Sequence, residues 1–473
     1  MLYKRTIVIG ATLAGAVLAG ALIWDWDRPS TSSLRPAAAG DIPQANLKLL
    51  APGVVSVALE SRYAWATSVT LRADGTIVVG AGTSPRVVSA PASDKSRAIV
   101  LRMAPDGRLA AVTQLADTPS AVSTVSIARD GTAVVAGFGQ PAEQVSQGSA
   151  RNRHSLLARL QPDGAFDPKF AGGSAILANM QSGWLTGGVA SAVAIGDDGG
   201  IIATGMAGYS INFFGQGSYC ATARFSRDGH FDRSFADNGR VLTLFPGKTR
   251  CTAAAVFVSP DREITVIGNA SSELGPHNIV AFRYLASGAP DPQFGRGGAY
   301  ILEEDADATG AALDSKGRIV TFGSKHGRFL VARYDSQGNA DRSFGEGGGV
   351  SLQGADSQPL NALALQADGK IVAVGTLGWH SGTRPPKPEK RDRIAVVRLD
   401  ENGALDESFA GGGLLLMDSS RYLWGGRGVA IQPDGKLLIA GYVVDEADNY
   451  ASSIVLVRLN PDGTPDTDFG SGL

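Results

Sequence analysis

The sequence predicts an all-β fold, a seven-bladed β-propeller of four-stranded antiparallel blades. The first observation is a repeated phrase: "LALQADGKIVAVG" at residues 363–375 returns as "VAIQPDGKLLIAG" at residues 429–441. Five variants precede it, and they begin at Val69, Val125, Val193, Val256 and Ala311. The turn glycines Gly75 and Gly435 stand six repeats apart, which gives a mean period of 60 residues. A period of this length is typical of propellers and solenoids.

The second observation is that each repeat contains two tight turns. The second turn follows a β-rich run, as in "SLLARLQPDG" from Ser155 and "IVLVRLNPDG" from Ile454. Asp-Gly and Asn-Gly between alternating apolar residues favour hairpins, because type I′ turns need a positive φ at both central residues. Two hairpins per repeat give four antiparallel strands. Since no helical period accompanies them, we expect a propeller rather than a solenoid.

The third observation is an Asp-x-x-Phe phrase after the second turn, as in "FDPKFAGG" from Phe166 and "PDTDFGSGL" at the end of the chain. The Asp is expected to turn the backbone through an Asx-type hydrogen bond. The Phe is expected to be a structural wedge between neighbouring repeats, and the glycines to permit a bulge into the fourth strand.

The last repeat ends without a fourth strand of its own. The stretch "GVVSVALES", residues 53–61, has strand composition and no earlier repeat to complete. We predict that it pairs with residues 454–460 as the outer strand of the last blade, which closes the ring and removes two open edges. The propeller is expected to span residues 53–473.

These phrases together resemble the delta-60 repeat family of β-propellers and, more distantly, NHL-type propeller repeats. The resemblance covers about residues 53–473 and implies a propeller fold. The family is not tied to one activity, so the resemblance implies no catalytic residue.

Residues 1–24 are expected to form a hydrophobic N-terminal helix that serves as a signal peptide or a signal anchor. Lys4 and Arg5 precede an uncharged apolar run over residues 6–24, which places the rest of the chain outside the cytoplasm. The run is long enough to span a bilayer, so a cleaved peptide and an uncleaved anchor both stay open. Residues 25–52, rich in Pro, Ser and Ala, are expected to be a flexible linker. We therefore expect a periplasmic, cell-surface or secreted protein.

The chain has two cysteines, Cys220 and Cys251. They precede or begin strands of neighbouring repeats at the same end of the predicted ring. A location outside the cytoplasm permits them to form a disulfide, and the alternative is two buried free thiols.

The charge balance argues against one class of partner. The formal net charge is −2, whereas a nucleic-acid-binding protein needs a basic surface. The remaining candidates are a protein, peptide or carbohydrate partner, with membrane contact only through the N-terminal segment.

The long loops between second and third strands, and between fourth and first strands, are predicted to form the binding face. Variable loops on a repetitive scaffold usually carry binding, and the Trp residues after position 26 fall in these regions. Exposed aromatic side chains on one surface indicate carbohydrate, peptide or protein contact; the alternative is that they cover the blade tops. We expect binding to centre on Trp65, Trp184, Asn361, Trp424 and Arg427.

The acidic stretch "LEEDADATG", residues 302–310, is a candidate cation site. Asp305 and Asp307 match the start of an EF-hand loop, but Lys316 stands where the bidentate Glu is required. The stretch is therefore not an EF-hand. The two carboxylates could still bind calcium, and the alternative is a solvated acidic loop.

No linear enzyme motif is present: the sequence has neither Gly-x-Ser-x-Gly nor His-Glu-x-x-His. We therefore favour a non-catalytic binding or protein-interaction module with no cofactor. The alternative is a metal-assisted hydrolase or lactonase-like enzyme whose axial site would use Asp305, Asp307, Asn361 and Arg427. A purely structural surface repeat is a third interpretation.

Overall fold

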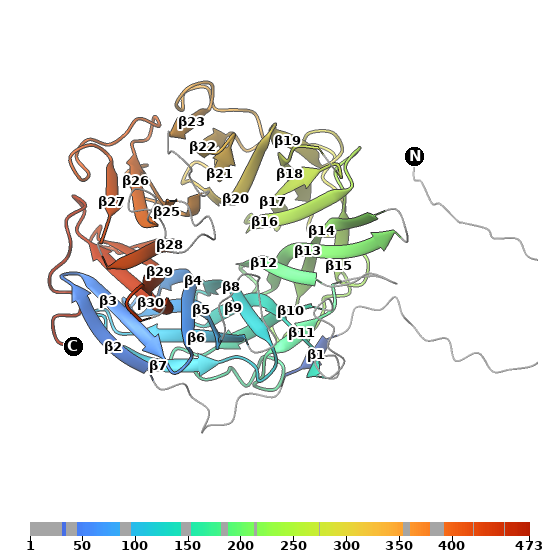
Figure 1. Cartoon of the computed structure of the whole chain (residues 1–473). Coiled ribbons are helices and arrows are strands. Elements are labelled where there is room, and N and C mark those ends of the chain that lie inside the picture. Colours follow the sequence, from blue (N-terminus) through green and yellow to red (C-terminus); the bar gives the residue numbers. More distant parts are fainter. Residues whose placement is uncertain are drawn as a thin grey trace, which may run out of the picture.

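The fold is described by a computed structural model over residues 31–34, 45–85, 96–142, 153–180, 188–211, 215–273, 275–352, 360–378, 392–419, 421–448 and 450–473 (Figure 1). Each secondary-structure element named in these ranges is a strand, from β1 to β30. The predicted N-terminal helix at residues 1–24 lies outside them. Within them, no helix is long and apolar enough to cross a membrane.

Most strands pair antiparallel with their chain neighbours in groups of four. The first three groups are β4 (Tyr63–Leu71), β5 (Ile77–Ser84), β6 (Arg97–Met103) and β7 (Leu109–Gln114); β8 (Ser120–Ile127), β9 (Ala133–Gly139), β10 (His154–Leu160) and β11 (Ile176–Ala178); and β12 (Gly188–Ile195), β13 (Ile201–Ile211), β14 (Gly215–Phe225) and β15 (Arg240–Thr243). The next three are β16 (Arg250–Val258), β17 (Ile264–Ser271), β18 (Asn278–Tyr284) and β19 (Ala299–Glu303); β20 (Ala306–Leu313), β21 (Ile319–Lys325), β22 (Arg328–Tyr334) and β23 (Gly349–Leu352); and β24 (Leu360–Leu365), β25 (Ile371–Leu377), β26 (Arg393–Leu399) and β27 (Leu414–Met417). The last group contains β28 (Tyr422–Ile431), β29 (Leu437–Asp445), β30 (Ala451–Leu459) and β3 (Val54–Leu59).

Hydrogen bonding joins these groups into five sheets. The two largest sheets each contain two groups, and in each a single parallel bridge links them. Ser218 of β14 pairs with Arg250 of β16, and Ser452 of β30 pairs with Tyr63 of β4.

The groups are arranged as a ring (Figure 1). The first strands of successive groups contact one another in a closed cycle: β4 with β8, β8 with β12, β12 with β16, β16 with β20, β20 with β24, β24 with β28, and β28 with β4. The first strands therefore surround the axis of the ring. Because strands alternate in direction, the short turns after first and third strands lie at one end, and the longer loops lie at the other. We call the second end the long-loop face.

The predicted closure of the ring is confirmed. β3 pairs antiparallel with β30, from Val54 opposite Val457 to Val57 opposite Ile454. A flexible linker was expected over residues 25–52, but two stretches of it are strands: β1 (Thr31–Ser33) pairs with β11, and β2 (Ala45–Ala51) pairs with β3. The physical reason is burial: Leu47 and Leu50 pack against the cores on either side of the last group. Residues 25–30 and 35–44 lie outside the described ranges.

The core lies between successive groups rather than within one. One cluster, for example, combines Val372 and Val396 of the sixth group with Ile439 and Val457 of the last. The Phe of each Asp-x-x-Phe phrase is part of this packing, as the structural prediction requires: Phe170, Phe235, Phe294, Phe344, Phe409 and Phe469 are fully buried.

An Arg on the third strand fixes each of these phrases. Arg333 donates from Nε to Asp341 at 2.8 Å and from Nη1 to the carbonyl of Glu401 in the next group at 2.6 Å. Its guanidinium lies 4.5 Å from the centroid of the Phe344 ring. The same contacts recur at Arg159, Arg224, Arg398 and Arg458. Each therefore holds its own phrase and the following group together.

Candidate functional site

A β-bulge occurs in the first strand of every group, at the same distance from the end of the strand. The bulged residues are Thr67, Ser123, Ser191, Ala254, Thr309, Asn361 and Arg427. Each stands four positions before the end of its strand, as Thr67 does before Leu71. Since the first strands encircle the axis, these residues form a level circle there. We call them the axial ring.

A glycine on the second strand makes room for the bulge. An added Cβ at Gly205 would lie 1.9 Å from the Val189 carbonyl oxygen, and one at Gly323 would lie 2.0 Å from that of Asp307. Real Cβ atoms do not approach an oxygen so closely, so only glycine fits at these two positions without a backbone shift. This glycine closes the repeated phrase in six of the seven copies; Ala81 occupies the position in the first. The glycine that ends the repeated phrase is visible in the sequence, but the phrase alone does not show that it stands opposite a bulge at the axis.

Each residue of the axial ring is more accessible than the residue that precedes it in the chain. The residue before each bulge is buried, whereas the ring residues are half-buried, and Thr309 and Arg427 are exposed. Bulges are often found beside functional sites because they redirect a side chain. All ring residues except Ala254 carry a polar side chain, so the ring presents hydroxyl, amide and guanidinium groups at the axis.

Arg427 and Asn361, both predicted as binding residues, are neighbours on this ring. Arg427 donates from Nη1 to Asn361 Oδ1 at 3.4 Å, and Asn361 Nδ2 donates to the Gly426 carbonyl at 2.7 Å. The guanidinium also lies 5.7 Å from the centroid of the Tyr442 ring. Burial raises the pKa of Tyr442, and the positive charge of Arg427 opposes that rise.

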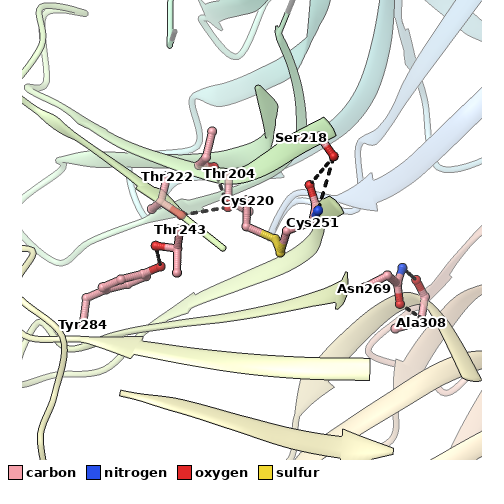
Figure 2. The surroundings of a disulfide bond; sticks show 10 residues. Thr204, Ser218, Cys220, Thr222, Thr243, Cys251, Asn269, Tyr284 and Ala308 are labelled. Atoms are coloured by element: carbon pink, nitrogen blue, oxygen red, sulfur yellow. Dashed lines mark hydrogen bonds between the residues drawn. A yellow bond between two sulfur atoms is a disulfide. The ribbon is translucent and has the colours of Figure 1, made fainter. Parts of the chain in front are cut away.

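An equivalent amide clamp supports the ring residue Thr309. Asn269 of β17 donates from Nδ2 to the Ala308 carbonyl at 2.8 Å and accepts from the Ala308 N–H at 2.7 Å (Figure 2). In both places, a side-chain amide of the preceding group satisfies the backbone of the residue just before the bulge. The bulge geometry is thereby fixed between groups as well as within one.

Of the predicted tryptophans, the structure describes Trp65 and Trp424, and neither is exposed. Trp65 is half-buried on β4, where its ring covers Gly82. Trp184 lies outside the described residues. Trp424 was expected to be an exposed contact residue, but it is 5% exposed and packs in the core between the last two groups. The cause is strand alternation in β28, which directs Trp424 into the neighbouring group.

The candidate cation ligands are placed as follows. Asp305 is exposed in a turn with φ of 54°, and its N–H donates to Asn278 Oδ1 at 3.4 Å. Asp307, on β20, is hydrogen-bonded to Nδ1 of His277. No cluster of three or more His, Cys, Asp or Glu side chains suited to a metal occurs in the described ranges. Calcium binding at Asp305 and Asp307 therefore stays a prediction.

Cys220 and Cys251 are joined by a disulfide, with a Cα–Cα distance of 4.8 Å (Figure 2). Both residues are buried, and the bond links β14 to β16 of the next group. Ser218 supports the junction: its hydroxyl donates to the Cys251 carbonyl at 3.0 Å and accepts from the Cys251 N–H at 3.3 Å.

Comparison with known proteins bears on the repeats. Residues 391–409 and 432–469 match the family described as "Domain of unknown function (DUF5122) beta-propeller". The resemblance of the repeats to this type of propeller family is thus confirmed for that part of the chain. No curated protein matches the sequence.

Solved structures resemble the chain at low identity. A protein of unknown function from Dyadobacter fermentans DSM 18053 is 13% identical, with 86% of this chain and 99% of that chain covered and a TM-score of 0.42. A sialidase from Trypanosoma rangeli is 12% identical, with 92% and 60% covered and a TM-score of 0.44. The native arabinanase of Bacillus subtilis is 14% identical, with 57% and 93% covered and a TM-score of 0.28. Likeness at this level does not extend to the ligands or reactions of those proteins.

Proposed function

We propose that the chain is a seven-bladed β-propeller that acts outside the cytoplasm as a non-catalytic binding module. In this proposal each group of four strands is one blade, and residues 1–24 are the signal peptide or membrane anchor. The partner is a protein, peptide or carbohydrate that reaches the axis from the long-loop face. The buried disulfide supports the location, because such bonds persist in oxidising compartments.

The axial ring is the observation that carries this proposal. A purely structural ring would have no need of accessible polar side chains on its innermost strands. Here the bulges present Thr67, Asn361 and Arg427 on consecutive blades, and Gly441 makes room for the bulge at Arg427. Polar groups that converge on one place from several elements are typical of a binding site.

A pair of substitutions in one blade tests the location. Thr309→Trp places a large side chain in the axial ring. Lys316→Trp places the same side chain in the exposed turn at the opposite end of the same blade, where Lys316 forms no side-chain contact with other described residues. We expect panels of immobilised oligosaccharides and peptides to bind the unmodified protein and the Lys316 variant, but not the Thr309 variant. Equal melting temperatures would show that both variants fold. Retained binding by the Thr309 variant, with loss in the Lys316 variant, would place the site at the turn end instead.

The alternative function is a metal-assisted hydrolase with an axial site. One feature favours it: Asp307 stands two positions before Thr309 on β20 and is hydrogen-bonded to His277, so a carboxylate and an imidazole group meet close to one residue of the axial ring. Hydrolysis of a chromogenic ester or lactone that is lost in Asp307→Asn would support this alternative. After the metal is removed, added divalent metal should restore the hydrolysis in the unmodified protein only. Binding without turnover would support the first proposal.

A further inference from the structure

We propose that Arg427 forms a carboxylate-binding subsite in the axial ring and that the ligand is an acidic, uronate-containing saccharide. This inference rests on the proposed function, because it assigns a chemical class to the ligand of the same ring.

The guanidinium of Arg427 is not directly paired with an acid, although the carboxylate of Asp392 adds to the rise that burial causes in the pKa of the adjacent Tyr442. Arg427 is exposed, and it forms no ion pair with a carboxylate among the described residues. Other arginines nearby differ: Arg398 is paired with Asp406 at 2.7 Å, and Arg421, on the approach to the same strand, is paired with Asp445. The axial ring contains no other charged residue. The ring therefore has a single positive charge, carried by one blade.

The guanidinium is also held in position before any ligand arrives. Asn361 Oδ1 accepts from one Nη atom, and the amide of Asn361 is itself fixed by the Gly426 carbonyl. The Tyr442 ring lies beside the guanidinium, and burial raises the pKa of its phenol. Arginine with a fixed plane binds a planar carboxylate through two parallel N–H groups. Preorganisation of this kind reduces the entropy lost on binding.

The other ring residues favour a saccharide as the body of the ligand. Thr67 donates its hydroxyl hydrogen to the Gly80 carbonyl at 3.0 Å, so its oxygen remains able to accept a hydrogen bond. Ser123, Ser191 and Thr309 add further hydroxyl groups around the axis. A circle of short hydroxyl side chains suits a molecule that itself carries many hydroxyl groups, and a single positive charge suits one carboxylate per sugar unit.

Calorimetric titration of the full chain with tetragalacturonate, and with its neutral methyl ester, tests the inference. The ester preserves the sugar and removes the charge. Arg427→Gln should weaken tetragalacturonate binding on the order of 10- to 100-fold, as expected for lost hydrogen bonds to a charged group, and should leave binding of the ester unchanged. Arg427→Lys keeps the charge but not the planar fork, so it should recover part of the affinity. Arg421→Gln, in the same blade, is the matched control and should bind as the unmodified protein does.

The outcomes separate this inference from the proposed function. If Thr309→Trp abolishes binding and Arg427→Gln does not, the axial ring binds without a carboxylate subsite, and the inference is wrong while the proposed function stands. If neither substitution affects binding, the ring is not the site and both fail. If the protein binds acidic peptides and not tetragalacturonate, the assignment to saccharides is wrong. Similar melting temperatures of the variants show that none of these results reflects unfolding.

Discussion

Arg458 donates a hydrogen bond from Nε to the Asp466 carboxylate at 2.6 Å, and its Nη1 donates to the carbonyl of Pro105. The pair belongs to the last repeat and Pro105 to the first, so one side chain fastens the two ends of the ring. Arg458 is only 9% exposed, and its guanidinium lies 4.6 Å from the centroid of the Phe469 ring. Loss of Arg458 would leave the buried Asp466 carboxylate with Lys436, at 2.9 Å, as its remaining cationic partner.

We therefore expect Arg458→Ala to lower the free energy of unfolding by about 3–5 kcal/mol. Arg108→Ala is the control, because Arg108 forms an ion pair with Asp106 near the same junction but is 67% exposed. Its effect should stay below about 1 kcal/mol. Urea denaturation followed by circular dichroism measures both. Equal effects would mean that the closing contact contributes no more than a surface pair.

The stability of the ring should fall in acid. A hydrogen bond from the Ser343 hydroxyl, aided by the Ser343 N–H and by Arg333, lowers the pKa of Asp341 from 3.8 to about 2. A carboxyl group with a lowered pKa in the folded state stabilises the fold above its unfolded pKa, and this contribution is lost as the pH falls toward 2. The expected loss is about 2 kcal/mol for this group. Urea midpoints measured from pH 5 to pH 2 should show a smaller decline in Asp341→Asn; an unchanged decline would contradict the assignment.

Gly323→Ala should disturb the bulge that places Thr309 in the axial ring. The new Cβ would lie 2.0 Å from the Asp307 carbonyl oxygen, so the backbone must move. We expect a destabilisation of about 2–4 kcal/mol, comparable with other severe steric changes. Gly349→Ala is the control, since its added Cβ would meet no atom closer than 3.7 Å and its φ is not in the left-handed region. Thermal denaturation compares the two; similar melting temperatures would show that the bulge tolerates a side chain.

Trp424→Ala tests the corrected assignment of this residue to the core. Removal of a buried Trp leaves a cavity between the last two groups, and the expected cost is about 3–5 kcal/mol. Leu414→Ala, at a position that is 43% exposed, should cost less than about 1 kcal/mol. Chemical denaturation distinguishes them. A Trp424 variant as stable as the unmodified protein would restore the interpretation of an exposed contact residue.

Reduction of the disulfide should weaken the junction between β14 and β16. The bond closes a loop of 31 residues, and removal of a disulfide of this kind typically costs about 2–4 kcal/mol. Dithiothreitol should lower the melting temperature of the unmodified protein. It should not change that of the double variant Cys220→Ala, Cys251→Ala, which serves as the control. A drop of the same size in both proteins would mean that the reductant acts elsewhere.

The repeat made much of the architecture predictable. Asp-Gly turns, spaced along the chain, locate the hairpins, and the missing fourth strand of the last repeat points to residues 53–61 as its substitute. That prediction is confirmed by the pairing of Val54 with Val457. The turn residues and the missing fourth strand were sufficient for these predictions, because both can be recognised in short stretches of sequence.

The site was harder to predict because it depends on register. Asn361 and Arg427 were selected for their nearness to the axis, but the shift that exposes them is caused by glycines on another strand. The short strand β2 was missed since Leu47 and Leu50 reveal their packing only when the last repeat is present beside them.

The closure of the ring also sets an order in time. Val54 pairs with Val457, which lies 403 positions later in the chain. β2 and β3 can pair with each other locally, but they join the last group only when this distant pairing forms. Contacts between the chain's distant ends form slowly, since a large loop must close first. The hairpins within each group can therefore form first, and the pairing of β3 with β30 closes the ring late in folding.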